Sequence, residues 1–215
     1  MTKGLGRFAP LTGVLAVVLW VVAIAVGESG DKPADNAPGA DIAAWMQQDS
    51  TNILLAATFL GIGSAAFIWF LGSVSEHFRR DGEGRLATVV MATGTSTIVT
   101  WTLFIAPAAA GALAHENLDR TLSPQAAETL FVMQDGFFVA AEFLAVGFMG
   151  AAAVALIRGK GSPSWFGWIT ALLAIVLMVG PIGWAGLIFG IPLWTLGVSI
   201  WLFVSGRRGA EATTA

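Results

Sequence analysis

The chain of 215 residues has no cysteine, only two histidines, and no lysine or arginine within its long apolar segments. The absence of cysteine excludes disulfides, cysteine-bound metals, iron–sulfur clusters and thiol chemistry. Two histidines cannot supply bis-histidine ligation to two haems, and a retinal Schiff base would need a lysine inside an apolar segment. We therefore expect no cofactor.

The sequence also lacks the motifs of common enzyme classes. It contains no P-loop, Rossmann glycine fingerprint, His-Glu-x-x-His pair or Gly-x-Ser-x-Gly elbow. The connections between apolar segments are too short for a soluble catalytic domain. We expect that the protein is not an enzyme.

Hydrophobic residues make up 56% of the chain and charged residues 12%, with a mean hydropathy of +0.76. A soluble domain of this length could not bury so much apolar surface, so lipid is the expected solvent. Backbone polar groups must be paired in lipid, which predicts an all-α membrane protein. We predict one domain, 1–215, with six transmembrane helices and two outer loops, at 28–49 and 111–129. The six helices are predicted at 10–27, 50–74, 86–110, 130–157, 164–180 and 185–205.

Two parts of this prediction have alternatives. The basic Met1–Arg7, the apolar Leu11–Ala25 and the small-x-small triplet Ala23–Ala25 also fit a cleaved signal peptide, which would leave five helices. The region 164–205 is about twice one span. We divide it at the five residues from Gly180 to Trp184, where Gly and Pro favour a turn, and a single re-entrant element is the alternative.

The basic residues are sorted between the two sides of the predicted bundle. Nine lie in alternate connections: Lys3, Arg7, Arg79, Arg80, Arg85, Arg158, Lys160, Arg207 and Arg208. Only Lys32 and Arg120 lie on the other side, which carries most of the acidic residues. The positive-inside rule predicts cytoplasmic termini. In size, topology and Ala/Gly/Val-rich composition the chain resembles small multi-pass proteins of bacteria, which implies a bacterial plasma membrane. No basic surface suggests nucleic acid.

Local patterns predict two further helical features. Ser123 followed by Pro124 is an N-cap serine with proline at the first helical position, so the fourth membrane helix should begin there. Residues Ile42–Gln48 predict a short interfacial helix with Trp45 and Met46 facing lipid.

Asp135 and Glu142 are the strongest functional signal. They are seven residues apart, which places them within about 20° of one helical face and about 10 Å apart along the axis. No basic residue lies in a predicted span to pair with them. Intramembrane carboxylates usually mark functional sites. The alternative for Glu142 is a neutral carboxyl that holds helices together through a hydrogen bond.

Thr93, Ser96, Thr97 and Thr100 follow helical spacing and form one hydroxyl stripe, which we predict to line a polar cavity. The alternative is that each hydroxyl group bonds its own helix backbone. Small residues at Gly61, Gly72, Gly147 and Ala151, among others, predict close helix packing within the bundle or in a homo-oligomer.

His115, Glu116 and Asp119 crowd the second outer loop and are weak candidates for a divalent metal site. A solvated acidic loop is the alternative.

These patterns together predict proton- or cation-linked permeation or transport in the lipid bilayer. Glu142 would be the buried ion-binding group and Asp135 the first carboxylate that an incoming ion meets. The alternative is a non-transporting accessory or scaffold subunit that holds a membrane partner.

Overall fold

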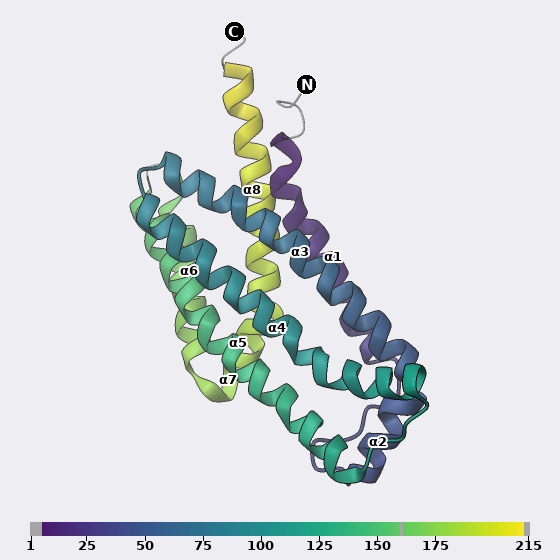
Figure 1. The fold of residues 1–215 in the computed structure, drawn as a ribbon. Coiled ribbons are helices and arrows are strands. Elements are labelled where there is room, and N and C mark those ends of the chain that lie inside the picture. The colour runs from purple at the N-terminus through teal and green to yellow at the C-terminus, as the bar shows by residue number, and fades with distance from the viewer. Residues whose placement is uncertain (1–5, 160, 213–215) are drawn as a thin grey trace. The chain divides into compact units, whose positions relative to one another are not determined.

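The computed structural model describes residues 6–159 and 161–212, with side chains for 8–159 and 161–205. The described residues form helices and no strands, which confirms the all-α prediction (Figure 1). In order these are η1 (Gly6–Leu11), α1 (Thr12–Gly27), α2 (Gly39–Gln48), α3 (Ser50–Arg80), α4 (Gly84–Leu118), α5 (Pro124–Arg158), α6 (Ser164–Met178), α7 (Gly180–Ala185), η2 (Gly186–Gly190) and α8 (Ile191–Ala212). Lys3 and Lys160 lie outside the described residues, as do the side chains of Arg7, Arg207 and Arg208.

Five helical stretches among the described residues are long and apolar enough to cross a membrane. They are Phe8–Gly27, Ser50–Arg80, Gly84–Leu118, Pro124–Arg158 and Gly180–Ser205. The remaining apolar helix, α6, has 15 residues and is shorter than a usual span. Because α4 continues to Leu118, much of the predicted second outer loop is helical.

The described residues fold into two compact units, and α1, α3, α4 and α5 contribute residues to both. Unit 1 is built from segments 1–17, 65–98 and 141–215, and unit 2 from segments 18–64 and 99–140.

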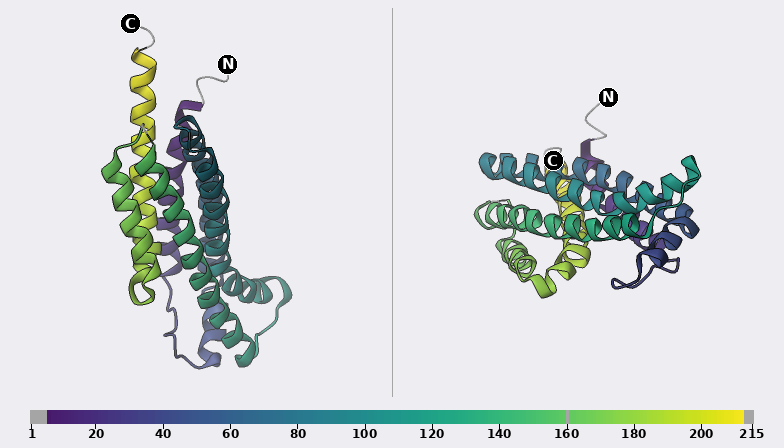
Figure 2. Two further views of the ribbon diagram at one scale, coloured as in Figure 1. Left: turned by 90° about the vertical axis from the view of Figure 1, so that its left-hand side faces the viewer. Right: turned by 60° about the horizontal axis from the view of Figure 1, so that its bottom comes forward.

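Four distant parts of the chain meet in unit 1. The rings of Phe8 and Phe203 stack with centroids 6.1 Å apart, and the rings of His77 and Trp201 meet edge to face at 4.8 Å. His77 Nε2 also lies 3.1 Å from the hydroxyl oxygen of Ser162. The beginning of η1, the end of α3, the α5–α6 connection and the last turns of α8 therefore lie together, and Figure 2 shows η1 beside α8.

Helix α6 and the α7–η2–α8 stretch form an antiparallel hairpin in unit 1. The side chain of Leu177 lies beside Gly186, and the ring of Phe166 lies beside Gly197. Between them, the indole N–H of Trp194 donates to the hydroxyl oxygen of Thr170 at 2.9 Å. Both of these polar groups are buried, so the hydrogen bond satisfies each of them within the packed seam.

Short sequence signals set several helix ends. Helix α5 begins at Pro124, as the Ser-Pro pair predicts, and the N–H of Ala126 donates to Ser123 Oγ at 3.3 Å. Helix α3 ends in a Schellman motif, in which Gly82 takes the left-handed conformation at φ 88°. The N–H of Glu83 bonds the carbonyl of Phe78, which closes the last turn.

The predicted turn from Gly180 to Trp184 differs from the structure. The break lies one residue earlier, at Val179, where the backbone leaves the helical region (φ −93°, ψ 90°). Residues Gly180–Ala185 instead form α7, with Pro181 in its first turn. Proline disrupts a helix interior but favours a helix start, because its missing N–H would be unpaired there in any case.

The prediction that Trp45 and Met46 face lipid is wrong. Both are buried in unit 2, where Met46 is fully covered. Helix α2 packs against α4 and α5 in an apolar cluster that contains Ala112 and Phe131. The sulfur of Met46 would lie 2.5 Å from a Cβ built at Gly111, so Met46 would have to shift to admit a side chain there.

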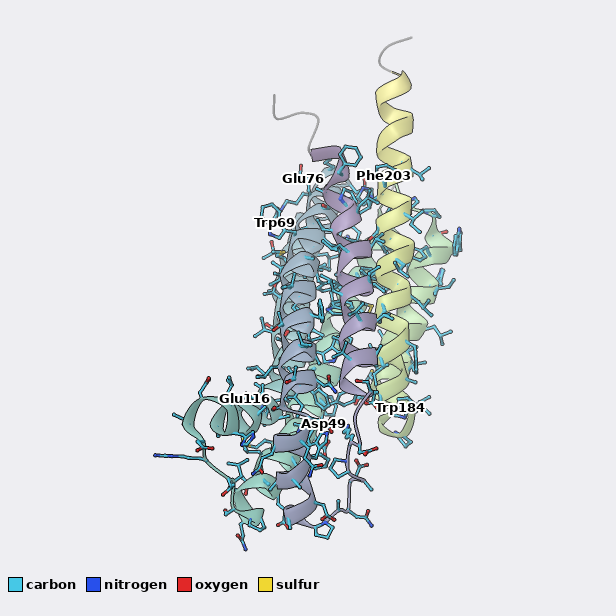
Figure 3. The ribbon with its side chains drawn as sticks, turned by 90° about the vertical axis from the view of Figure 1, so that its right-hand side faces the viewer. Asp49, Trp69, Glu76, Glu116, Trp184 and Phe203 are labelled. Atoms are coloured by element: carbon cyan, nitrogen blue, oxygen red, sulfur yellow. The ribbon has the colours of Figure 1, made fainter. Side chains whose placement is uncertain are left out.

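Large apolar side chains elsewhere remain on the surface. Trp69 is 73% exposed and projects from α3 (Figure 3), and Phe143, Leu172 and Leu193 are exposed to a similar extent. Soluble monomers rarely expose so many large apolar groups together. The surface therefore suits a membrane-embedded protein.

Candidate functional site

Glu142 is buried in unit 1, with 8% of its surface exposed, and faces the break between α6 and α7. Its Oε1 has no hydrogen-bond partner among the described residues. The carboxyl group lies directly against the backbone of Gly183, so that a Cβ built at Gly183 would overlap Oε1. Only a glycine at this position leaves room for the carboxyl group.

The carbonyl oxygen of Leu177 lies at the same place. It is 3.0 Å from the Cβ position at Gly183, so it converges with Glu142 Oε1 on one side of that glycine. In a continuous helix the Leu177 carbonyl would accept the N–H four residues later, but residue 181 is proline and has none. The break therefore leaves a backbone acceptor beside a carboxyl group.

The hairpin has a second irregularity after α7. Residues Gly186–Gly190 form a π-helical turn, in which the N–H of Ile191 donates to the carbonyl of Gly186. Pro192 follows at once, and it removes the N–H that would normally bond Ile188. Single π-turns within helices often lie at functional sites.

The structure places the other predicted carboxylate differently. Asp135 on α5 is exposed, whereas its neighbour Gln134 is buried. The spacing of seven residues therefore does not give Asp135 and Glu142 the same surroundings.

Three of the four hydroxyl groups in the stripe donate hydrogen bonds to the backbone of their own helix, α4. Thr93, Ser96 and Thr97 each donate to the carbonyl four residues earlier, at 2.7, 2.9 and 2.8 Å. Ser96 is exposed, Thr97 is buried, and Thr100 is partly buried. The hydrogens of these three hydroxyl groups are therefore bonded to the backbone, and only their oxygen lone pairs are left to accept a further contact.

The close helix contacts predicted at small residues are present at one of three glycines and absent at the other two. Gly147 lies against Thr93 of α4, because a Cβ there would be 3.5 Å from the Thr93 methyl group. A Cβ built at Gly61 or Gly72 would meet nothing within 4 Å. Close packing within the chain therefore explains Gly147 but not the two glycines of α3.

The acidic residues of unit 2 make structural contacts. Glu116 accepts a hydrogen bond from Ser50, and Glu128 Oε1 accepts the N–H of Gly39 at 3.0 Å. Within the part of the chain that the structure describes, no group of three His, Asp or Glu side chains could hold a metal ion. His115, Glu116 and Asp119 thus do not form such a group.

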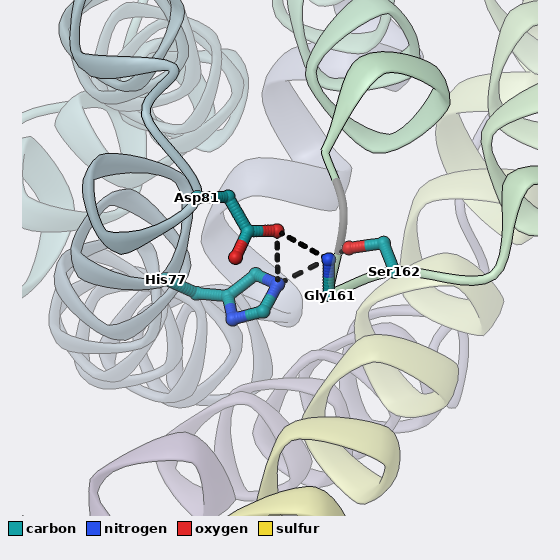
Figure 4. Close-up of polar contacts among 4 residues, drawn as sticks. All are labelled: His77, Asp81, Gly161 and Ser162. Carbon is teal, nitrogen blue, oxygen red and sulfur yellow. Dashed lines mark hydrogen bonds and ion pairs between the residues drawn. The ribbon is translucent and has the colours of Figure 1, made fainter.

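A His–Asp–Ser cluster lies at the end of α3 (Figure 4). His77 Nε2 lies 3.1 Å from Ser162 Oγ and 3.5 Å from Asp81 Oδ2, and the N–H of Gly161 donates to Asp81. In a catalytic triad the carboxylate and the nucleophile contact opposite nitrogens of the imidazole ring. Here Asp81 and Ser162 both approach Nε2 of His77, so the geometry does not match a triad. The cluster instead connects the α5–α6 connection to the end of α3.

The sequence did not predict the neighbours of Glu142, namely Gly183 and the Leu177 carbonyl. A Gly-Pro pair within an apolar run was the available signal, but one sequence cannot show which helix would face the break. No known protein family, curated protein or solved structure matches this chain.

Proposed function

We propose that the protein is an integral membrane protein that crosses the bilayer six times, with both termini on the cytoplasmic side of a bacterial plasma membrane. The contacts within unit 1 support this topology. Phe8, His77, Ser162 and Phe203 lie together, so the chain leaves this end and returns to it three times. Three round trips are six passes.

The charge distribution agrees with this orientation. The segments of unit 1 carry nine of the eleven basic residues, and those of unit 2 carry only Lys32 and Arg120. Two of the basic residues are held in ion pairs, Arg158 with Glu83 at 3.2 Å and Arg80 with Glu76 at 3.0 Å. Connections rich in Lys and Arg remain in the cytoplasm.

In this topology the fifth pass ends at the α6–α7 break, close to the outer surface of the membrane. Helix α6 has 15 residues and is therefore about 22 Å long, whereas the hydrocarbon core is about 30 Å thick. Non-helical backbone at membrane depth is tolerated only within protein or beside water. Glu142 and the Leu177 carbonyl would then lie at the inner end of a water-filled path from the outside.

We further propose that the protein carries out proton-linked transport or permeation, with Glu142 as the group that takes up the proton. The observation that carries this proposal is that an unpartnered buried carboxyl oxygen lies beside the Leu177 carbonyl, whose usual helical donor is replaced by Pro181. Discontinuous membrane helices bind ions in transporters through such free backbone groups. Asp135 remains the proposed first carboxylate on the path.

A proton fits this site better than a metal cation. Two oxygens that face each other are both satisfied when one carries a hydrogen and donates to the other. A dehydrated cation needs more oxygen ligands than these two. An uncompensated charge here would be costly, so proton uptake and release would have to be coupled to movement or to water access.

Proton flux into liposomes tests this function. The purified chain, reconstituted with a pH-sensitive dye inside, should acidify the lumen under an imposed pH gradient faster than protein-free liposomes do. The rate should not change when sodium and potassium are replaced by a large organic cation. Flux that requires sodium or potassium would favour the cation alternative. Absence of flux, together with a stoichiometric co-purifying partner, would favour a scaffold subunit.

A further inference from the structure

Unit 2 contains a cavity of about 110 Å³ that the proton site does not use. Its wall includes four aromatic side chains from three helices: Trp20 of α1, Trp45 of α2, and Trp101 and Phe104 of α4. The Trp20 and Trp101 rings pack with centroids 5.1 Å apart and are largely covered. We call this space the tryptophan cavity.

One polar side chain lines the interior of the tryptophan cavity. Gln134 is 4% exposed, and its Nε2 has no hydrogen-bond partner among the described residues. Leaving such a buried donor unpaired is unfavourable, so an acceptor in the cavity would stabilise it.

The size and lining of the tryptophan cavity restrict what can fill it. A buried water usually needs two to four polar partners, and apolar walls with one buried amide offer few. An apolar cavity of about 150 Å³ can hold benzene, so the smaller volume here limits the buried group to at most a single aromatic ring. Glu28 and Lys32 are exposed at its edge, and their opposite charges favour no net charge on the ligand.

We propose that the tryptophan cavity binds an uncharged, largely apolar group the size of one aromatic ring, which bears one acceptor oxygen that Gln134 Nε2 binds. The oxygen is a carbonyl, ester or ether oxygen. It belongs either to a free small molecule or to a bilayer lipid, since both carry this chemistry. This inference does not depend on proton transport by Glu142.

A matched pair of probes tests the proposal on the full chain in nanodiscs. The probes are 4-fluoroacetophenone and 4-fluoro-α-methylstyrene, which have the same shape but differ in a carbonyl oxygen. Fluorine NMR should detect saturable binding of the ketone, above its partitioning into empty nanodiscs. The hydrocarbon should bind about tenfold more weakly, because it cannot accept the Gln134 hydrogen bond.

Two variants assign this preference to the cavity. Gln134→Leu should remove the preference for the ketone, whereas Gln125→Leu, at an exposed glutamine of α5, should retain it. Ala23→Phe places a ring in the cavity and should abolish the binding of both probes. If a variant fails to fold, the comparison of the two probes on the wild-type chain still tests whether the cavity prefers a ligand with an acceptor oxygen.

The lipid composition identifies the source of the natural acceptor. Weaker ketone binding in diacyl nanodiscs than in dialkyl nanodiscs would show that a lipid ester carbonyl competes for Gln134. Equal binding in the two would point to a free small molecule. Either result agrees with the proposal. Absence of saturable ketone binding, equal affinity for the two probes, or a preference that survives Gln134→Leu would overturn it.

Discussion

Proteoliposomes that contain the Glu142→Gln variant are expected to carry no proton flux above that of protein-free liposomes. Glutamine has the same shape as glutamate but cannot gain or lose a proton near neutral pH. Its amide N–H can donate to the Leu177 carbonyl, which lies on the same side of Gly183 as the carboxyl oxygen. We therefore expect the free energy of unfolding to be unchanged or higher by up to about 1 kcal/mol.

The matched control for this variant is Glu76→Gln. Glu76 is an exposed carboxylate on α3 that pairs with Arg80, so the substitution also removes one negative charge. Exposed ion pairs contribute about 0–1 kcal/mol, and flux and stability should both stay near the wild-type values. Wild-type flux from Glu142→Gln would show that Glu142 does not carry the proton. A failure of this variant to fold would point to a structural role for the carboxylate.

Gly183→Ala is expected to lower proton flux about tenfold or more, although it adds only one methyl group. The new Cβ would occupy the position of Glu142 Oε1 and would force the carboxyl group away from the Leu177 carbonyl. Small misplacements of a reacting group have large effects on rate. Overpacking usually costs about 1–3 kcal/mol, but here the displaced atom is the free end of a side chain. We expect a loss near the lower limit of that range.

Gly180→Ala is the control for Gly183→Ala in the same helix. A Cβ built at Gly180 meets nothing within 4 Å, so this variant tests the general effect of alanine near the break. It should retain wild-type flux. Equal losses in the two variants would mean that the flexibility of α7 matters rather than the position of the Glu142 carboxyl group. Unchanged flux in Gly183→Ala would contradict the proposed site.

The sequence was sufficient to predict the helical architecture, because its signals are strong and local. Hydropathy indicated helices, and the Ser123–Pro124 pair located the beginning of α5 to the residue. The burial of Glu142 also agrees with its position within a long apolar segment. These predictions depend on neighbouring residues or on composition, and both can be seen in a single chain.

The sequence was not sufficient where the outcome depends on contacts between distant segments. Trp45 and Met46 form an apolar pair that suits a membrane surface, yet α2 packs them against α4 and α5. In the same way, Gly183 lies 41 positions from Glu142, and nothing in either segment specifies the other. Proline at residue 181 suggested a turn, but its preference for a helix start moved the break to Val179.

Infrared difference spectroscopy of the reconstituted protein, recorded between acidic and alkaline buffer, tests the central claim most directly. The account predicts a C=O stretching band from a protonated buried carboxyl group that changes with pH, shifts in D₂O and is missing in Glu142→Gln. The same band should be altered in Gly183→Ala. A Glu142 band that stays constant over the whole pH range in which the helices remain folded would contradict the account, since the carboxyl group would then be sealed from water.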